Sequence, residues 1–118
     1  MAIIPTITAV SYLNTIPFVY GLKHADNLRA DLLLAPPAEC AKNYIEGKAD
    51  IALLPAAVVP ELKQTNIITD YCIGAVGPVR TVTVMSNVPI GRVKRIWLDV
   101  HSRTSVQLCG YLAQHKWH

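Results

Sequence analysis

The chain has 118 residues, of which 52% are hydrophobic and 16% are charged, and its formal net charge is +3. This composition is that of a globular protein and excludes an intrinsically disordered one. The basic residues are scattered and are not interleaved with aromatic residues, which argues against nucleic acid as a partner.

Short apolar runs alternate with helical segments along the chain. β-branched residues dominate the strand segments, and Asn, Pro and Ser stand where helices would begin. The predicted strands are residues 6–10, 31–34, 50–54, 67–75, 80–85 and 95–100. The predicted helices are residues 14–24, 36–46, 56–63 and a last one from residue 102, with Leu108, Cys109, Leu112 and Ala113 on its inner face.

Strands that alternate with helices predict βαβ units and hence an α/β fold, with a largely parallel sheet flanked by helices. In open sheets of this kind, ligands bind beyond the carboxyl ends of the strands. This rule selects the loops at residues 11–15, 55–57, 86–89 and 101–105 as candidate ligand-binding segments.

The strongest local signal is the polar segment at residues 99–105, which follows a predicted strand and opens a helix. Unpaired backbone N–H groups and the positive end of the helix dipole favour an anion at such a position. Arg103 can add a bidentate grip on a carboxylate. The alternative is that Ser102 only caps the helix and Arg103 is solvated, and spacing alone leaves both interpretations open.

Two other polar positions also follow predicted strands. Asn14 can orient a hydroxyl or a carboxylate, although an Asn before a helix is ordinarily a cap. Ser86 lacks a GxSxG elbow, so a polar loop is the plainer interpretation.

The glycines form no dinucleotide- or phosphate-binding spacing, and the cysteines and histidines form no metal-binding spacing. We therefore expect neither a cofactor nor a metal. The N-terminus lacks the features of a signal peptide and no apolar run has the length of a membrane span, so we expect a cytoplasmic protein that does not enter a membrane.

Four blocks of sequence together resemble the chorismate dehydratase family, and the resemblance runs from Val10 to Trp117. The blocks are VSYLNTIPFVYGL at 10–22, DIALLP at 50–55, ITDYCIGAVGPVRTV at 68–82 and LDVHSRTSVQL at 98–108. The resemblance implies a type 2 periplasmic-binding-protein-like fold with a ligand cleft between two lobes. Residues 1–88 would form the N-terminal part of lobe one, and residues 89–118 the hinge crossing and the first β–α unit of lobe two. Because family members are more than twice as long, the chain is expected to be an N-terminal fragment.

The resemblance also implies a reaction, the dehydration of chorismate to 3-[(1-carboxyvinyl)oxy]benzoate in the futalosine route to menaquinone. The carboxylate of the substrate's own side chain would remove the proton, and neither metal nor cofactor would be needed. Asn14 and Ser86 would be the catalytic residues. The remaining residues would bind the chorismate dianion: Tyr12, Pro55, Ala56, Asn87, Ser102, Arg103, Thr104 and Ser105. The fragment alone is expected to be inactive.

Three alternatives accompany this interpretation. A non-catalytic protein that binds a small aromatic or carboxylate anion would share the fold, because the fold alone does not determine function. A sister enzyme of the same pathway forms dihydroxynaphthoate on a similar fold, with an N-terminal motif that differs from SYLNT. As a purely structural object, the fragment is expected to self-associate, since open sheet edges and apolar helix faces need cover.

Overall fold

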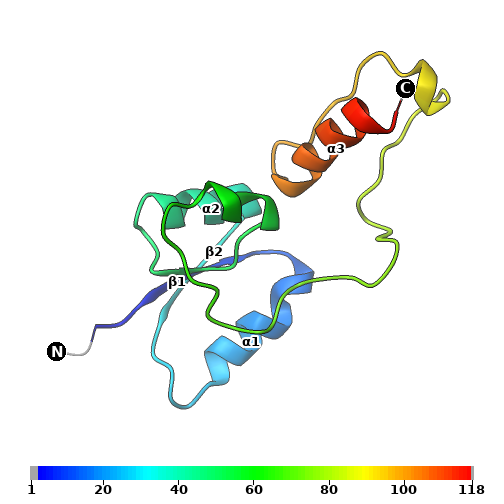
Figure 1. The fold of residues 1–118 in the computed structure, drawn as a ribbon. Coiled ribbons are helices and arrows are strands. Elements are labelled where there is room, and N and C mark those ends of the chain that lie inside the picture. Colours follow the sequence, from blue (N-terminus) through cyan, green and yellow to red (C-terminus); the bar gives the residue numbers. More distant parts are fainter. Residues whose placement is uncertain (1–2, 118) are drawn as a thin grey trace.

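The computed structural model describes residues 3–117. The elements alternate between strands and helices up to residue 61, and only two helical elements follow (Figure 1). With η denoting a 3-10 helix, they are β1 (Thr6–Val10), η1 (Leu13–Thr15), α1 (Ile16–His24), β2 (Asp31–Ala35), α2 (Pro37–Ile45), β3 (Ile51–Ala52), η2 (Ala56–Glu61), η3 (Ile90–Arg92) and α3 (Thr104–His115).

The three strands form one parallel sheet in the order β2-β1-β3. β1 pairs with β2 along its whole length and with β3 at Ile7 and Thr8. The Leu53 N–H extends the second ladder by donating to the Thr8 carbonyl at 2.9 Å. The predicted α/β fold with a parallel sheet flanked by helices is therefore confirmed, although β3 is shorter than predicted and its two residues are only half-buried.

Both helices of the sheet unit begin at prolines, as predicted. Pro17 lies in the first turn of α1, and Pro37 is the first residue of α2. A proline is tolerated there because the first-turn N–H groups have no partner within the helix. Beyond the end of α2, Gly47 has a φ of 69°, a left-handed conformation that glycine adopts without a Cβ clash.

The core of the sheet unit is built from small side chains. α2 packs across all three strands, with Cys40 and Ala41 completely buried. On the central strand, Thr8 and Ala9 are buried to the same degree. Because none of these side chains is large, the helix and the sheet approach each other closely. Val58 of η2 is the largest of the fully buried residues.

The direction of the connections reverses at β1, since the chain goes from β1 to β2 on one side and then returns past β1 to β3. With right-handed crossovers, such a reversal places the two connecting helices on opposite faces of the sheet. Figure 1 shows this arrangement, with α1 and α2 on opposite sides of the strands.

Residues 62–103, which we call the arm, run as an extended chain away from the sheet (Figure 1). The strands predicted at 67–75, 80–85 and 95–100 are wrong: apart from η3, the arm has no helix or strand. A strand exists only where a neighbouring strand exchanges backbone hydrogen bonds with it. The arm has the residue types of strands without such a neighbour.

The last helix was also only partly predicted. α3 forms close to the predicted start, but none of its residues within 104–115 is buried. Leu108, predicted to face inward, is 50% exposed. Ala113 is exposed as well, whereas Cys109 and Leu112 are half-buried, so the predicted inner face is only partly covered.

The molecule is elongated, with extents of 61 × 28 × 22 Å and a radius of gyration of 17.1 Å. A compact domain of this length has a radius of gyration of about 13.5 Å. The difference reflects the arm, none of whose residues is buried.

The three cysteines differ in exposure, which predicts an order of reactivity. Cys40 is buried and its Sγ donates to the Ala35 carbonyl at 3.4 Å, Cys109 is intermediate and Cys72 is exposed. We expect a thiol reagent at neutral pH to label Cys72 first and Cys40 only after unfolding, as followed by mass spectrometry of digested protein. Labelling of Cys40 at the rate of Cys72 would contradict the packing of α2.

Burial raises the pKa of the Cys40 thiol, because the thiolate is poorly solvated inside the protein. In the unfolded protein the thiol has a pKa of about 8.5. Above that pH the unfolded chain gains free energy by ionising a thiol that stays protonated in the folded protein, so the free energy of unfolding falls as pH rises. Denaturant titrations should therefore show a steeper loss of stability above that pH for the wild type than for Cys40→Ala. Equal slopes would show that the thiol ionises as freely in the folded protein as in the unfolded one.

Candidate functional site

The topology marks the carboxyl end of the sheet, between the loops that follow β1 and β3, as the expected position of a ligand, and we call this position the crevice. The chain leaves β1 toward α1 and leaves β3 toward η2, and these two strands are neighbours. Where neighbouring parallel strands send their connections in opposite directions, their loops part and leave room for a ligand. The loops concerned are residues 11–15 and 53–57, which include two of the four segments that the sequence selected, 11–15 and 55–57.

Asn14 lies in the middle of η1, immediately beyond β1. The residue that caps α1 is Thr15, and neither helix has a side-chain capping hydrogen bond at its start. The interpretation of Asn14 as a helix cap is therefore wrong. Its side chain is exposed, and none of the hydrogen bonds among residues 3–117 uses its amide, so both the donor and the acceptor remain available to a ligand.

Thr15 was not singled out from the sequence, although it belongs to the selected loop. It is completely buried, and its hydroxyl has no hydrogen-bond partner among the described residues. Buried hydroxyls nearly always have a partner, and the hydroxyl of Thr8 in the sheet core also lacks one, so the orphan at Thr15 does not by itself indicate a bound group. No local pattern distinguishes Thr15 from an ordinary threonine, because its isolation arises from the packing around it.

The start of α3 reaches the same crevice from the far end of the chain. The Ala57 N–H donates to Thr104 Oγ1 at 3.4 Å, across 47 positions of sequence. Pro55, the N-cap residue of η2, is half-buried there, whereas Ala56 is exposed. The structure thus brings the predicted residues of η2 and of the α3 start together beside the end of β3.

Ser102 lies just before α3, whose N-cap residue is Arg103 and makes no side-chain capping hydrogen bond. The Ser102 Oγ accepts a hydrogen bond from the Ser105 N–H at 3.2 Å and so satisfies one donor of the first turn. The interpretation of Ser102 as the N-cap is therefore wrong in its position, although the serine does bond to the helix start. The anion-binding interpretation of the helix start is compatible with this bond, because it satisfies only one of the first-turn N–H groups.

Arg103 lies beside α2. It lines a shallow groove of about 630 Å³ together with residues of that helix and of the turn after it: Ala38, Glu39, Lys42, Asn43, Ile45, Glu46 and Lys48. Two carboxylates therefore share this groove with the guanidinium, and a bound anion would compete with them for it.

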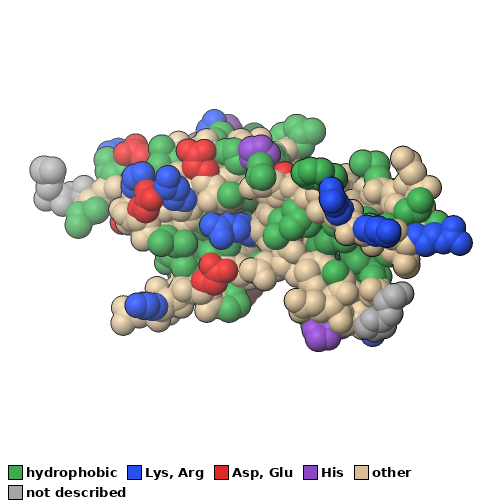
Figure 2. Space-filling view, turned by 90° about the horizontal axis from the view of Figure 1, so that it is seen from above, with side chains coloured by type: hydrophobic (Ala, Val, Ile, Leu, Met, Phe, Trp, Pro, Cys, Tyr) green, Lys and Arg blue, Asp and Glu red, His purple; other side chains and the backbone are tan. Residues whose placement is uncertain are grey.

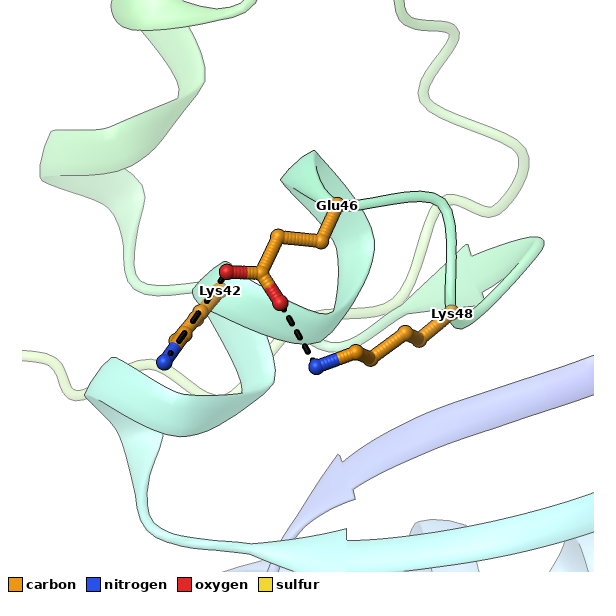
Figure 3. A network of polar contacts seen from close by, with 3 residues as sticks. All are labelled: Lys42, Glu46 and Lys48. Atoms are coloured by element: carbon orange, nitrogen blue, oxygen red, sulfur yellow. Dashed lines mark ion pairs between the residues drawn. The ribbon is translucent and has the colours of Figure 1, made fainter.

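Figure 3 shows the ion pairs on the rim of this groove. Glu46 contacts Lys48 at 2.6 Å and Lys42 at 3.9 Å through its two carboxylate oxygens. The hydrogen bond from Lys48 lowers the pKa of Glu46, and the same contact raises the pKa of Lys48. A catalytic base for neutral pH needs a pKa near 7, so Glu46 is shifted in the wrong direction for that role.

Ser86 and Asn87 lie on the arm, outside this cluster. The Ser86 hydroxyl donates to the Val88 carbonyl at 2.8 Å and accepts from the Val88 N–H at 3.1 Å. Over residues 3–117, no hydrogen bond joins Ser86 or Asn87 to η1, η2 or α3. Tyr12, by contrast, stands next to η1 and is 47% exposed at the crevice loop.

In the part of the chain that the structure describes, no three His, Cys, Asp or Glu side chains are grouped closely enough to hold a metal ion. None of its helices has the length and apolar character required to cross a membrane.

The sequence matches the family model described as menaquinone biosynthesis over residues 5–118. The chain belongs to the menaquinone biosynthesis family. No solved structure matches it. The family match includes all the segments that form the crevice, from η1 to α3.

Replacing Ser102 with Ala tests its bond to the start of α3. Losing the bond to the Ser105 N–H should destabilise α3 by about 1 kcal/mol, whereas Ser102→Asp should retain most of the stability. Hydrogen exchange of the first amides of α3 measures the effect. If Ser102→Ala exchanges no faster than the wild type, the bond does not stabilise the helix start.

Replacing Thr15 with Val keeps the side-chain shape and removes the orphan hydroxyl. We expect the free energy of unfolding to rise by about 1 kcal/mol, because the buried hydroxyl loses water on folding and gains no bond. Denaturant titration measures the change, with Thr83→Val as the control, because Thr83 is exposed. A loss of stability in Thr15→Val would mean that the hydroxyl is satisfied in the folded protein.

Proposed function

We propose that the protein is a hydro-lyase that converts chorismate into 3-[(1-carboxyvinyl)oxy]benzoate. The proposal rests on membership of the menaquinone biosynthesis family and on the four sequence blocks that resemble chorismate dehydratase. The structural observation that supports it is the bond between Ala57 and Thr104, because it brings the helix start that we propose to bind a carboxylate to the loop that follows β3.

The proposed reaction is an elimination of water. The C–H bond of the ring carbon that bears the enolpyruvyl ether breaks, and its electron pair forms a new ring double bond. The hydroxyl on the adjacent carbon leaves and takes up a proton, so that water is released and the ring becomes aromatic. No oxidant or reductant enters this balance.

Positioning is the main task that such a reaction sets for the protein. The substrate is a flexible dianion, and holding its side-chain carboxylate against the C–H bond replaces a separate base. The backbone N–H groups and hydroxyls of residues 102–105 would bind one carboxylate. Asn14 would orient the enolpyruvyl carboxylate or the departing hydroxyl through its free amide.

Ser86 has a more demanding role in this proposal. Its hydroxyl is bonded within its own loop, so the arm must fold toward the crevice before Ser86 can contact the substrate. Tyr12, Pro55, Ala56 and Asn87 would line the closed site. The 118-residue chain alone is accordingly expected to convert little chorismate.

The second candidate is a non-catalytic protein that binds a small aromatic or carboxylate anion. It is favoured by the same features of the crevice, since a helix start and a neutral amide bind anions without being acids or bases. Product formation separates the two candidates, because a binding protein would retain chorismate unchanged.

The test measures chorismate turnover by a protein of the family's full length that carries this sequence. Chromatography with mass spectrometry should detect a product lighter than chorismate by one water. In that protein, Asn14→Ala should lower kcat/KM at least about 100-fold, the loss typical of removing one preorganised polar group from a reacting centre. Ser86→Ala should also lower it, and the double variant should be inactive.

Asn27→Ala is the matched control, because Asn27 is an exposed asparagine in the loop between α1 and β2, at the opposite end of the sheet. It should retain wild-type activity. Full activity of the Asn14→Ala, Ser86→Ala double variant would overturn the assignment of catalytic residues. Tight chorismate binding without any product would replace the lyase with the binding protein.

A further inference from the structure

The hydrogen bond from the Ala57 N–H to Thr104 Oγ1 caps η2 from a distant part of the chain. Ala57 is the second residue of η2, and Pro55, the N-cap residue, makes no side-chain capping bond because proline carries no side-chain oxygen. The first bond of η2 runs from the Val58 N–H to the Pro55 carbonyl at 2.9 Å, so the Ala57 N–H has no partner within its own helix. Thr104 supplies the hydroxyl that a local cap would supply, from 47 positions away.

η2 is the firmly held side of this contact. Val58, which follows Ala57, is 1% exposed and belongs to the core. Four residues before Ala57, the Leu53 N–H donates to the carbonyl of Thr8 on the central strand at 2.9 Å. A group that is bonded to Ala57 is therefore fixed relative to the carboxyl ends of β1 and β3.

α3 is the loosely held side. None of its residues is buried, and it packs mainly against η2. Among residues 3–117, the bond to Thr104 is the one hydrogen bond between the segment 3–61 and the segment 90–117, and neither ion pair joins the two. The position of the helix start relative to the crevice therefore depends on one hydroxyl.

The part of the molecule that Thr104 attaches to η2 is basic. Residues 62–118 contain seven Lys and Arg against two Asp and Glu, whereas residues 1–61 contain four against six. On the face shown in Figure 2, acidic side chains lie over the sheet end, and the charged side chains at the opposite end are basic. Holding α3 against η2 thus brings positive charge toward the crevice, which favours a dianion there.

We propose that Thr104 is a positioning residue of the crevice, an inference that rests on the function proposed above. Its Oγ1 accepts the Ala57 N–H and so holds the start of α3 at the loop that follows β3, where one dianion can contact both segments. The proton of the Thr104 hydroxyl is not used by any hydrogen bond among residues 3–117, so donation to a carboxylate is compatible with this role.

Exchange of the Ala57 amide with solvent, measured by NMR on the 118-residue chain without ligand, tests the bond itself. Thr104→Val keeps the size of the side chain and removes the hydroxyl, so the Ala57 amide should exchange about 3- to 10-fold faster, the factor that one net hydrogen bond represents. Thr104→Ser keeps the hydroxyl and should exchange at nearly the wild-type rate. Thr83→Val, at an exposed threonine of the arm, is the matched control and should leave the rate unchanged.

Steady-state kinetics of the full-length protein with chorismate test the positioning. Thr104→Val should raise KM about 3- to 10-fold and leave kcat within about 2-fold, because the bond aligns segments that hold the substrate and the transition state alike. Thr104→Ser should restore KM, and Thr83→Val should not change it. Far-UV circular dichroism shows whether the helices persist in each variant.

Three results would overturn the proposal: equal Ala57 exchange in Thr104→Val and the wild type, a Thr104→Ser variant that behaves like Thr104→Val, or a fall in kcat with KM unchanged. Equal exchange together with a raised KM would make Thr104 a direct ligand of the substrate only. A wild type that binds chorismate and forms no product would overturn the lyase instead, and the exchange rates and chorismate affinities of the same variants would still decide the role of Thr104.

Discussion

The rest of the structure depends on the position of β1 between two parallel neighbours and directly beneath α2. The strand is paired on both sides, and Thr8 and Ala9, which point to opposite faces of the sheet, are both buried, as are Cys40 and Ala41 of α2. Such close packing admits only small side chains, because an added methylene would force the helix off the sheet. It also fixes where β1 ends, and therefore where the crevice opens.

Local sequence signals predicted the sheet unit because its determinants are local. The prolines that open α2 and the glycine that follows it restrict the backbone whatever surrounds them. β-branched residues at 6–10 favour an extended chain, and the connections are short enough to bring each strand beside the last. Given these elements, the handedness rule leaves one way to place the two helices.

The predictions for the arm and for α3 failed because the determinants there are not local. The residues of the arm favour strands, but pairing requires a neighbour that local propensity cannot supply. The predicted inner face of α3 is only partly covered for the same reason, because a helix face is buried only where another element lies against it. At the site, sequence could not distinguish a capping Asn14 from a free one. The presence of η1, which shifts the start of α1 to Ile16, decides that question.

The arm also connects the stability of the fold to the assembly of the site. It is anchored near both ends, since Tyr44 Oη bonds Thr65 Oγ1 at 3.0 Å and the Ala57 N–H bonds Thr104 Oγ1 at 3.4 Å. With its ends held, the entropy of closing this long loop has already been lost, and burying its apolar residues costs correspondingly less. Ser86 lies between the anchors, so any cover that orders the arm also limits where this serine can lie. Completion of the core and placement of the second proposed catalytic residue are therefore expected to be one event.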